Sequence, residues 1–397
     1  MAGLTSFDAA LARLAQAAGP LDSQSVPLAV AAGRVLASPV HARLASPRVA
    51  VSAMDGYALA DATTRAGDWL EVIGEARPGL PFGGEVGPGQ AVRLFTGAPL
   101  PPGADRVIMQ EHAERDGGRV RFTPGYGPAW HVRAAGSDFA EGALLLEAGT
   151  LLTPRALLAA AAADMAELTV YRRPRLAILG TGDELAAPGT AASQPFAIPE
   201  SVTLGVAALA ADSGAEVVWR GSHGDDLAGL TERAGALLAM SDLVVVTGGA
   251  SVGDYDFAKA MFAAHGLDLV FSKLAIKPGK PVWFGRSGDC LVLGLPGNPT
   301  SALVTASLFL RPLLARLQGR PVAAALPWRR LPLAAPLPPT GDRETFVRTI
   351  WDEAGLRPVR NQDSGAQLAL AQSEWLVRCP IDTPALPAGT VVSALQL

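Results

Sequence analysis

The stretch from Asp242 to Asp256 carries residue types suited to chemistry, because an apolar run there ends in a glycine-rich turn beside acids. Residues 243–246 read Leu-Val-Val-Val, a run typical of a strand buried on both faces of a parallel sheet. Backbone amides that can surround an anion follow at Gly248, Gly249 and Ser251. Carboxylates follow at Asp254 and Asp256. The stretch indicates either an oxyanion held with a divalent cation or a tight strand-to-helix turn capped by aspartates.

The lysines form a second candidate group. Nearly all of the 33 basic residues are arginines, and the lysines lie close together in the sequence, at Lys259, Lys273, Lys277 and Lys280. A chain that otherwise uses arginine for positive charge, but keeps lysines within residues 273–280, indicates a site that needs a compact ammonium group on a flexible stem. We expect these lysines to face an anion.

Composition limits the classes of function. The chain has 397 residues, enough for two or more domains, and a net charge of −4 argues against nucleic acid as the main partner. The longest apolar run, around residues 156–163, is too short to span a bilayer, and the first residues lack a secretory pattern. Cys290 and Cys379 have neither metal-ligand nor disulfide-framework spacing. We expect a cytoplasmic protein with no membrane partner and with reduced thiols.

The regions outside the glycine-rich stretch differ in amino-acid composition and in the secondary structure that they predict. Residues 1–40 and 140–173 are predicted to form a helical and linker domain, with helices over residues 7–18, 26–36 and 151–168. The last of these opens with Thr153 as N-cap and Pro154 at the first helical position. Residues 41–139 carry short strands, such as 69–73 and 119–122, between turn signals, which predicts a β-rich domain. The proline-rich residues 321–397 predict a small terminal β-domain.

Polar turns in the two β-domains are further candidates. In the first domain they are residues 52–58 with Asp55, residues 95–101 with Thr96, and residues 133–138 with Asp138. In the terminal domain the candidate is the turn of residues 362–365, which contains Ser364. Taken singly, each of the first three is more typical of a structural turn than of a site.

Residues 174–320 alternate between strands and helices, which predicts a mostly parallel sheet with helices on its faces. Strands are expected at residues 175–179, 216–220, 243–246, 269–273, 282–285 and 290–293. Helices are expected at residues 201–212, 227–240 and 257–265, and from Pro299 to about Leu317. Ligands of such sheets bind beyond the carboxyl ends of the strands. The polar residues that follow strand ends are Glu184, Asp225, Ser251, Asp254, Lys277 and Asn298.

Taken in order, these segments resemble the MoeA family of molybdenum-inserting enzymes (molybdopterin molybdenumtransferases), which is shared with the E domain of gephyrin. The resemblance covers essentially the whole chain, and it rests on the order and spacing of the segments. They are residues 52–58, 95–101, 103–111, 133–138, 180–185, 247–256, 277–281 and 295–301, with a weaker match at 343–348.

The resemblance implies a multidomain α/β plus β protein. The expected parts are an α/β pterin-binding domain (174–320), N-terminal helical and β segments, and a C-terminal β-barrel. It also implies a homodimer whose active site lies between the α/β domain of one subunit and the N-terminal half of the other. The implied reaction takes adenylylated molybdopterin and molybdate, hydrolyses the adenylate, places molybdenum on the dithiolene and releases AMP. Possible further partners are the adenylyltransferase that makes the substrate and the enzymes that receive the cofactor.

The chemistry can be matched to residue types. Glu184, Asp225 and Asp254 are expected to hold Mg²⁺ and to orient the pyrophosphate, with Asp55 and Asp138 arriving from the partner subunit. Lys273, Lys277 and Lys280 are expected to face the phosphates and molybdate. Thr96 is expected to position a water or a metal ligand. The expected pterin and phosphate contacts are Thr181, Gly182, Asp183, Gly248, Gly249, Ser251, Pro296, Gly297, Asn298 and Ser364.

The sequence departs from the family pattern at several positions. Ala50 and Val51 replace an Asp-Asn pair, and a loop that normally ends in Asp-Ser/Thr-Asn reads Glu200-Ser201-Val202. Near the C-terminus, Ala369 replaces a serine, and residues 373–375 depart from an Ala-Asn/Asp-Gly pattern. These losses of polar groups leave open a non-catalytic pterin-binding or scaffold protein. An adenylyltransferase of the MogA type, which shares the α/β fold, is a third interpretation, against which the long terminal extensions argue.

Overall fold

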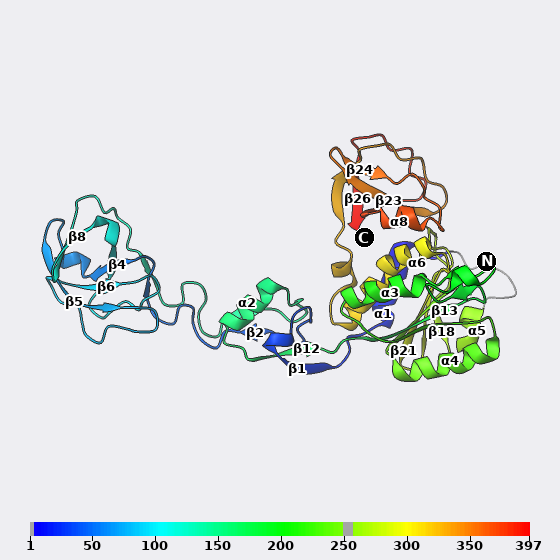
Figure 1. Ribbon diagram of the computed structural model, residues 1–397, viewed down its shortest axis with the longest axis horizontal. Coiled ribbons are helices and arrows are strands. Elements are labelled where there is room, and N and C mark those ends of the chain that lie inside the picture. Colours follow the sequence, from blue (N-terminus) through cyan, green and yellow to red (C-terminus); the bar gives the residue numbers. More distant parts are fainter. Residues whose placement is uncertain (1–3, 249–256) are drawn as a thin grey trace. The chain divides into compact units, whose positions relative to one another are not determined.

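The computed structural model describes residues 4–248 and 257–397, and the chain divides into two compact units (Figure 1). The larger unit contains Met1–Gln24, Gly33–Ala37 and Thr169–Leu397. The smaller unit contains Ser25–Ala32 and Ser38–Leu168. Each unit has hydrophobic cores of its own.

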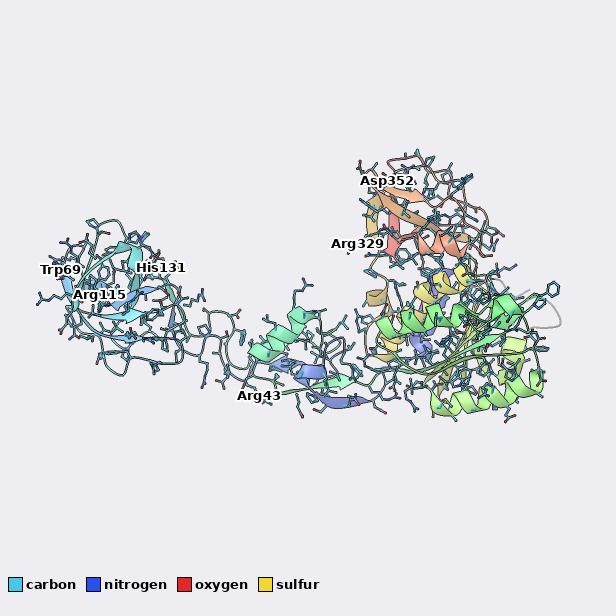
Figure 2. All side chains as sticks on the ribbon, in the orientation of Figure 1. Arg43, Trp69, Arg115, His131, Arg329 and Asp352 are labelled. Atoms are coloured by element: carbon cyan, nitrogen blue, oxygen red, sulfur yellow. The ribbon has the colours of Figure 1, made fainter. Side chains whose placement is uncertain are left out.

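The smaller unit is built mainly of short strands. Its main sheet has the order β7-β4-β6-β5-β9-β8, and only β5 and β6 are parallel neighbours. The bounds are β4 Gly56–Leu59, β5 Trp69–Ala76, β6 Gln90–Leu94, β7 Arg106–Met109, β8 Ala113–Asp116 and β9 Arg119–Phe122. Trp69 is exposed at the start of β5 (Figure 2). The guanidinium of Arg121 lies over its ring, 5.0 Å from the ring centre. The strands expected at residues 69–73 and 119–122 are therefore confirmed.

Shorter elements complete this unit. β3 (Val51–Ser52) pairs with β10 (Val132–Arg133), and β2 (Val40–His41) pairs with β11 (Leu144–Leu146). Helix α2 runs from Pro154 to Ala162, and the hydroxyl of its N-cap Thr153 accepts from the Ala156 amide, as expected.

Two helix predictions near the domain junctions need correction. The helix expected over residues 26–36 is wrong, because β1 (Ser23–Pro27) is followed by a 3₁₀ turn (Leu28–Val30). Pro27 has no N–H for a helix, and β1 pairs instead with the distant β12 (Glu167–Tyr171). The helix expected over residues 151–168 ends earlier, at Ala162, and Asp164 adopts a left-handed backbone (φ 63°) before β12 begins.

The centre of the larger unit is a sheet in the order β16-β13-β17-β21-β20-β18. The first four strands run parallel, and β20 is antiparallel to both of its neighbours. The strand bounds are β13 Arg175–Thr181, β16 Glu216–His223, β17 Leu243–Thr247, β18 Asp268–Phe271, β20 Trp283–Ser287 and β21 Cys290–Leu295. The helix bounds are α3 Val202–Asp212, α4 Leu227–Met240 and α5 Phe257–Ala263.

Strand β13 shows why helices cover both faces of this sheet. Alternate residues of a strand point to opposite faces, and all residues of β13 after Arg175 are buried. Leu176 and Ile178 share a core with Val206 of α3, whereas Leu179 shares a core with Leu230 of α4. Figure 1 shows α3 and α4 on opposite sides of the sheet. The chain leaves β13 toward β16 over one face and returns to β17 over the other, so the connections diverge between β13 and β17.

A long apolar helix packs into the larger core. α6 (Pro299–Thr305) continues through a π-helical segment (Ala306–Leu310) into α7 (Arg311–Leu317). Among the described residues, this is the helix whose length and composition would suit a membrane span. Because 83% of its apolar window is buried inside the protein, it has the surroundings of a core helix. Phe309 of this helix packs edge-on against Phe7 of α1 (Phe7–Ala17), with ring centres 5.5 Å apart.

The terminal residues form a second sheet of the larger unit. Its order is β19-β23-β25-β26-β22, and β24 pairs with β23. The bounds are β19 Ile276–Lys277, β22 Arg329–Pro332, β23 Glu344–Asp352, β24 Gly355–Pro358, β25 Trp375–Cys379 and β26 Val391–Gln396. A short helix, α8 (Gln367–Ala371), lies between β24 and β25 in the sequence. Since β19 comes from the α/β region and pairs in parallel with β23, the lysine segment belongs to this sheet.

Candidate functional site

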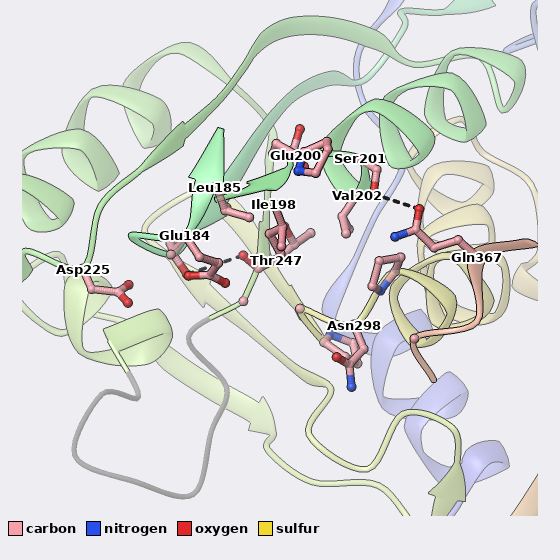
Figure 3. A pocket seen from close by; sticks show the side chains of 18 of the residues that line it. Glu184, Leu185, Ile198, Glu200, Ser201, Val202, Asp225, Thr247, Asn298 and Gln367 are labelled. Carbon is pink, nitrogen blue, oxygen red and sulfur yellow. Dashed lines mark hydrogen bonds between the residues drawn. The ribbon is translucent and has the colours of Figure 1, made fainter. Parts of the chain in front are cut away.

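A cavity of about 740 Å³ lies at the carboxyl ends of β13, β17 and β21, next to the point where the connections diverge (Figure 3). This is the edge where α/β sheets bind ligands. We call it the acidic cavity, because Glu184, Glu200 and Asp225 line it. Predicted contact residues that line it are Thr181, Gly182, Gly248, Pro296, Gly297 and Asn298.

Two of these acids, Glu184 and Asp225, enter the cavity from the turns after β13 and β16. Glu184 follows β13, and Asp225 follows β16 and donates its backbone N–H to the carboxylate of Asp183 at 2.9 Å. Burial, together with the charges of Asp183 and Glu184, raises the pKa of Asp225 above its ordinary value. These carboxylates therefore repel one another, and a cation would relieve the repulsion.

Close approach of the loops explains the glycines. Gly248 has a φ of +93°, and a Cβ there would lie 2.5 Å from the carbonyl oxygen of Thr181. A Cβ on Gly297 would lie 3.2 Å from the Cα of Gly248. The turns after β13, β17 and β21 therefore touch backbone to backbone, which brings their amides to one place.

The terminal β-domain contributes one side of the acidic cavity. Gly365 and Gln367 line it, and the hydroxyl of Ser201 donates to the side chain of Gln367 at 3.5 Å (Figure 3). Asn298, at the N-cap of α6, donates its side-chain N–H to the hydroxyl of Ser364 at 3.0 Å. This bond joins the α/β domain to the terminal domain beside the cavity.

A second cavity, of about 800 Å³, adjoins the first, and we call it the lysine cavity. Lys277 and Lys280 line it, together with Arg343 and Ser364. Pro281 lines both cavities, and the Asn298–Ser364 bond joins a residue of the acidic cavity to one of the lysine cavity. The acids and these two lysines thus line neighbouring cavities of the same unit. Lys273 is not among the described residues lining either cavity, and its carbonyl accepts from the Thr5 amide at 3.0 Å.

The predicted residues of the β-rich domain lie in the smaller unit. One carboxylate oxygen of Asp55 accepts from the amide of Thr96 at 2.7 Å and from its hydroxyl at 2.8 Å. These two bonds, with the charge of Arg93, hold the pKa of Asp55 below its usual value. Asp138 lies in another turn, where its amide donates to the carbonyl of Ser46 at 3.0 Å.

Gly249, Ser251 and Asp254 lie outside the described residues. Within the described ranges, 4–248 and 257–397, no group of three or more His, Cys, Asp or Glu side chains could hold a metal ion. Of the three predicted metal ligands, Glu184 and Asp225 lie within the described residues.

Several lining residues were not among the predicted site residues, notably Leu185, Ile198, Glu200, Val202 and Gln367. The parallel pairing of β14 (Leu185–Ala186) with β15 (Ile198–Pro199) brings two of them to the cavity, and nothing local in the sequence marks that pairing. In the sequence, Glu200 is marked only by its departure from the family pattern.

Glu200 has a structural role at the start of α3. Its buried carboxylate accepts from the Thr203 amide at 2.7 Å and from the Thr203 hydroxyl at 2.6 Å. Glu200 lies just before the N-cap residue Ser201, and its carboxylate accepts a backbone N–H of the first turn of α3. A negative charge at this end of a helix is stabilising.

Comparison with known proteins covers the whole length of the chain. Residues 5–163 match the MoeA N-terminal region (domain I and II), residues 177–316 a probable molybdopterin binding domain, and residues 330–397 the MoeA C-terminal region (domain IV). A molybdopterin molybdenumtransferase of Nostoc is 34% identical over 392 residues, covering 95% of this chain and 89% of that protein. Molybdopterin molybdenumtransferase 2 of Mycobacterium tuberculosis is 35% identical over 387 residues, covering 94% of this chain and 95% of that protein.

Solved structures agree with this assignment. A crystal structure of the molybdopterin biosynthesis moeA protein from Pyrococcus horikoshii matches with a TM-score of 0.85 at 25% identity, and the match covers 100% of both chains. The predicted multidomain architecture, an α/β domain with sheet-rich domains around it, is thereby confirmed. With relatives of this similarity over nearly its full length, the chain belongs to the MoeA family of molybdopterin molybdenumtransferases.

Proposed function

We propose that this protein inserts molybdenum into adenylylated molybdopterin and releases AMP, a step of molybdenum cofactor synthesis. Its relatives carry the name molybdopterin molybdenumtransferase, and its central domain matches a probable molybdopterin binding domain. The observation that carries the proposal is the pair of adjoining cavities. One is lined by carboxylates and glycine turns, the other by lysines, and Pro281 lines both.

The two cavities suit the two substrates. In the proposal, the glycine turns and Asn298 hold the pterin and its pyrophosphate in the acidic cavity. Molybdate, a dianion, enters the lysine cavity, where Lys277, Lys280 and Arg343 supply positive charge. The dithiolene and molybdate then meet where the two cavities adjoin, beside Pro281.

In the proposal, the acidic cavity also binds magnesium. Glu184 and Asp225, together with Asp254 of the predicted set, would hold the ion through carboxylate oxygens, which are the ligands that Mg²⁺ prefers. The raised pKa of Asp225 supports this, because burial and the charges of Asp183 and Glu184 both disfavour its ionised form, and a bound cation would offset both effects. Bound there, Mg²⁺ would neutralise negative charge on the pyrophosphate as the adenylate is hydrolysed.

The smaller unit supplies further residues in the proposal. Asp55, Thr96 and Asp138 would come to the acidic cavity from the second copy in a homodimer. The hydrogen bonds from Thr96 keep Asp55 ionised, which suits a residue that faces a cation or a water. The adenylyltransferase that makes the substrate and the enzymes that receive the cofactor are further partners in this proposal.

The test is an assay with adenylylated molybdopterin, Mg²⁺ and molybdate that measures both AMP release and molybdenum bound to the pterin. The parent is expected to give both, while Asp225→Ala and Lys277→Ala lose most of the activity. Glu232→Gln, on the exposed face of α4, is the matched control and keeps it. Binding of the pterin without turnover would instead identify a scaffold protein, and consumption of ATP would identify an adenylyltransferase.

A further inference from the structure

A separate cavity of the larger unit lies around the ends of α7 and shares no lining residue with the acidic or the lysine cavity. Its volume is about 360 Å³, and we call it the arginine cavity because Arg311 and Arg320 line it. Asp212 and Ser213 close it at the end of α3, and Gln396 of β26 closes it from the terminal sheet. Known small-ligand pockets measure roughly 300–1,000 Å³, so this cavity suits a small ligand.

The two arginines are poorly supplied with acceptors. Arg311 donates to the carbonyl of Gln396 at 3.3 Å, and Arg320 donates to the carbonyl of Ala324 at 3.5 Å. A guanidinium has five N–H donors, so most remain available. Neither arginine takes part in an ion pair recorded among the described residues. Burial lowers the pKa of both, and only for Arg311 does a carboxylate, that of Asp212, oppose the effect.

Two other arginines of this chain, both half-buried, are paired with carboxylates. Arg172 binds Asp242 with two hydrogen bonds, and Arg378 lies between Asp8 and Glu344. Desolvating a cation without a partner costs free energy, which is why buried charges are normally paired. Arg311 and Arg320 lack such a pair among the described residues. Buried Arg34 and Arg348 also donate to carbonyls and have no ion pair in the described part of the chain, but Arg311 and Arg320 line the same cavity.

We propose that the arginine cavity binds a small anion that carries a phosphate group, held between Arg311 and Arg320. The planar guanidinium fork matches phosphate oxygens in pairs, which an ammonium group cannot do. The ligand would bridge α3, α7 and the terminal strand β26, and so stabilise the junction of the α/β domain with the terminal sheet. This site is distinct from the proposed catalytic cavities and does not depend on the proposed reaction.

The experiment is calorimetric titration of the full-length protein with inorganic phosphate, and separately with glycerol phosphate, at constant ionic strength. The lysine cavity can also take oxyanions, so the parent used here and every variant carry Lys277→Gln, which removes one of the cations of that cavity. We expect one site per chain, weakened about tenfold or more by Arg311→Gln or Arg320→Gln, because each loses charge-assisted bonds. Arg115→Gln is the matched control, because exposed Arg115 also donates to a single carbonyl, that of Gly117, and lies in the smaller unit.

The two titrants distinguish the possible ligands. Tighter binding of glycerol phosphate identifies a phosphate ester, and equal or weaker binding identifies free phosphate as the ligand. Either result supports the site, provided that the arginine variants lose it. Equal binding by the parent and both arginine variants would overturn the proposal, as would no binding at all.

A second kind of variant tests the site even if the arginine variants misfold. Ala324→Glu places a carboxylate at the exposed rim of the cavity while leaving both arginines in place. It is expected to weaken phosphate binding about tenfold or more and to keep or raise Tm, since the new carboxylate gives Arg320 a counter-charge like the one that Asp212 gives Arg311. Unchanged phosphate binding in Ala324→Glu would also overturn the proposal.

Discussion

Asp55 and Thr96 are joined by two hydrogen bonds, from the Thr96 amide at 2.7 Å and from its hydroxyl at 2.8 Å, both to the same carboxylate oxygen. They come from turns 41 residues apart in the sequence. The threonine hydroxyl is thus already engaged as a donor. Its role in the proposed reaction is to set the ionisation and orientation of Asp55.

Thr96→Val should therefore raise the pKa of Asp55 part of the way toward its ordinary value. The variant keeps the amide bond, which contributes most to the lowered pKa, and loses only the hydroxyl bond. A carboxyl-carbon NMR titration measures the shift, and the acid limb of the activity profile should move to higher pH with it. Thr96→Ser, which keeps the hydroxyl, is the control. An identical titration of Asp55 in Thr96→Val and the parent would refute this role.

Asp225→Asn should stabilise the protein in the absence of Mg²⁺ and weaken stabilisation by Mg²⁺. The folded-state pKa of Asp225 is raised, so the folded carboxyl keeps its proton longer than the unfolded one. Stability therefore falls as pH rises from the unfolded pKa, about 3.9, through the raised folded pKa. The variant should lack this loss and gain about 0.5 kcal/mol at neutral pH. Thermal unfolding with and without Mg²⁺ measures both effects.

Glu232→Gln, an exposed change on α4, is the control for this prediction. Its Mg²⁺-dependent shift in Tm should equal that of the parent. If Asp225→Asn showed the parent's full shift, Asp225 would not be a magnesium ligand.

Asp242 stabilises the start of the central sheet. Its carboxylate accepts two bonds from Arg172, at 2.6 and 2.7 Å, and one from the Arg175 amide at 2.8 Å. Burial raises the pKa of Asp242, but these bonds outweigh burial and leave it lowered. Asp242→Asn should cost about 1.5–3 kcal/mol of unfolding free energy at pH 7. Because the folded pKa is depressed, this stability is present above the unfolded pKa and disappears as pH falls through the folded pKa.

Urea unfolding at several pH values measures this contribution. The control is Asp289→Asn, which removes an exposed ion pair with Arg286 and should change stability by less than about 0.5 kcal/mol. Equal losses for the two variants at pH 7 would contradict the prediction.

Local patterns in the sequence predicted the elements of the α/β domain well. The helix expected over residues 227–240 is found as α4, because Asp226 caps it and apolar residues recur along one face. The run at residues 243–246 becomes β17, which is buried along its whole length between β13 and β21. Once strands and helices alternate, the ligand edge of the sheet follows from general rules.

The pairing of strands that lie far apart in the chain could not be predicted from local sequence patterns. Nothing near Ile276–Lys277 indicates that this segment pairs with β23, about 70 residues later, and that pairing gives the lysines a cavity of their own. Likewise, a helix was expected over residues 26–36, but this region begins with the end of β1 and a 3₁₀ turn, because β1 pairs with β12. In both cases the partner segment decided the local structure. The roles of the individual site residues stay predictions.

Arg348 shows how the terminal domain holds the loop beside the site. This buried side chain donates to the carbonyls of Asn361 at 3.1 Å and Asp363 at 3.0 Å, and more weakly to that of Ala366 at 3.5 Å. The same loop carries Ser364, which accepts from Asn298 at the acidic cavity. Arg348 is thus a positioning residue for one wall of the proposed site.

Arg348→Met should release this loop and cost about 2–4 kcal/mol, because it leaves buried carbonyls without donors. Hydrogen exchange of residues 361–366 should become faster, and KM for the pterin substrate should rise more than kcat falls, because the loop shapes the wall and not the reacting groups. Arg360→Gln, an exposed change just before the loop, should leave exchange and KM as in the parent. If exchange in the loop of Arg348→Met stayed at the parent rate, the hydrogen bonds of Arg348 would not be what holds the loop, and the Asn298–Ser364 contact would need another support.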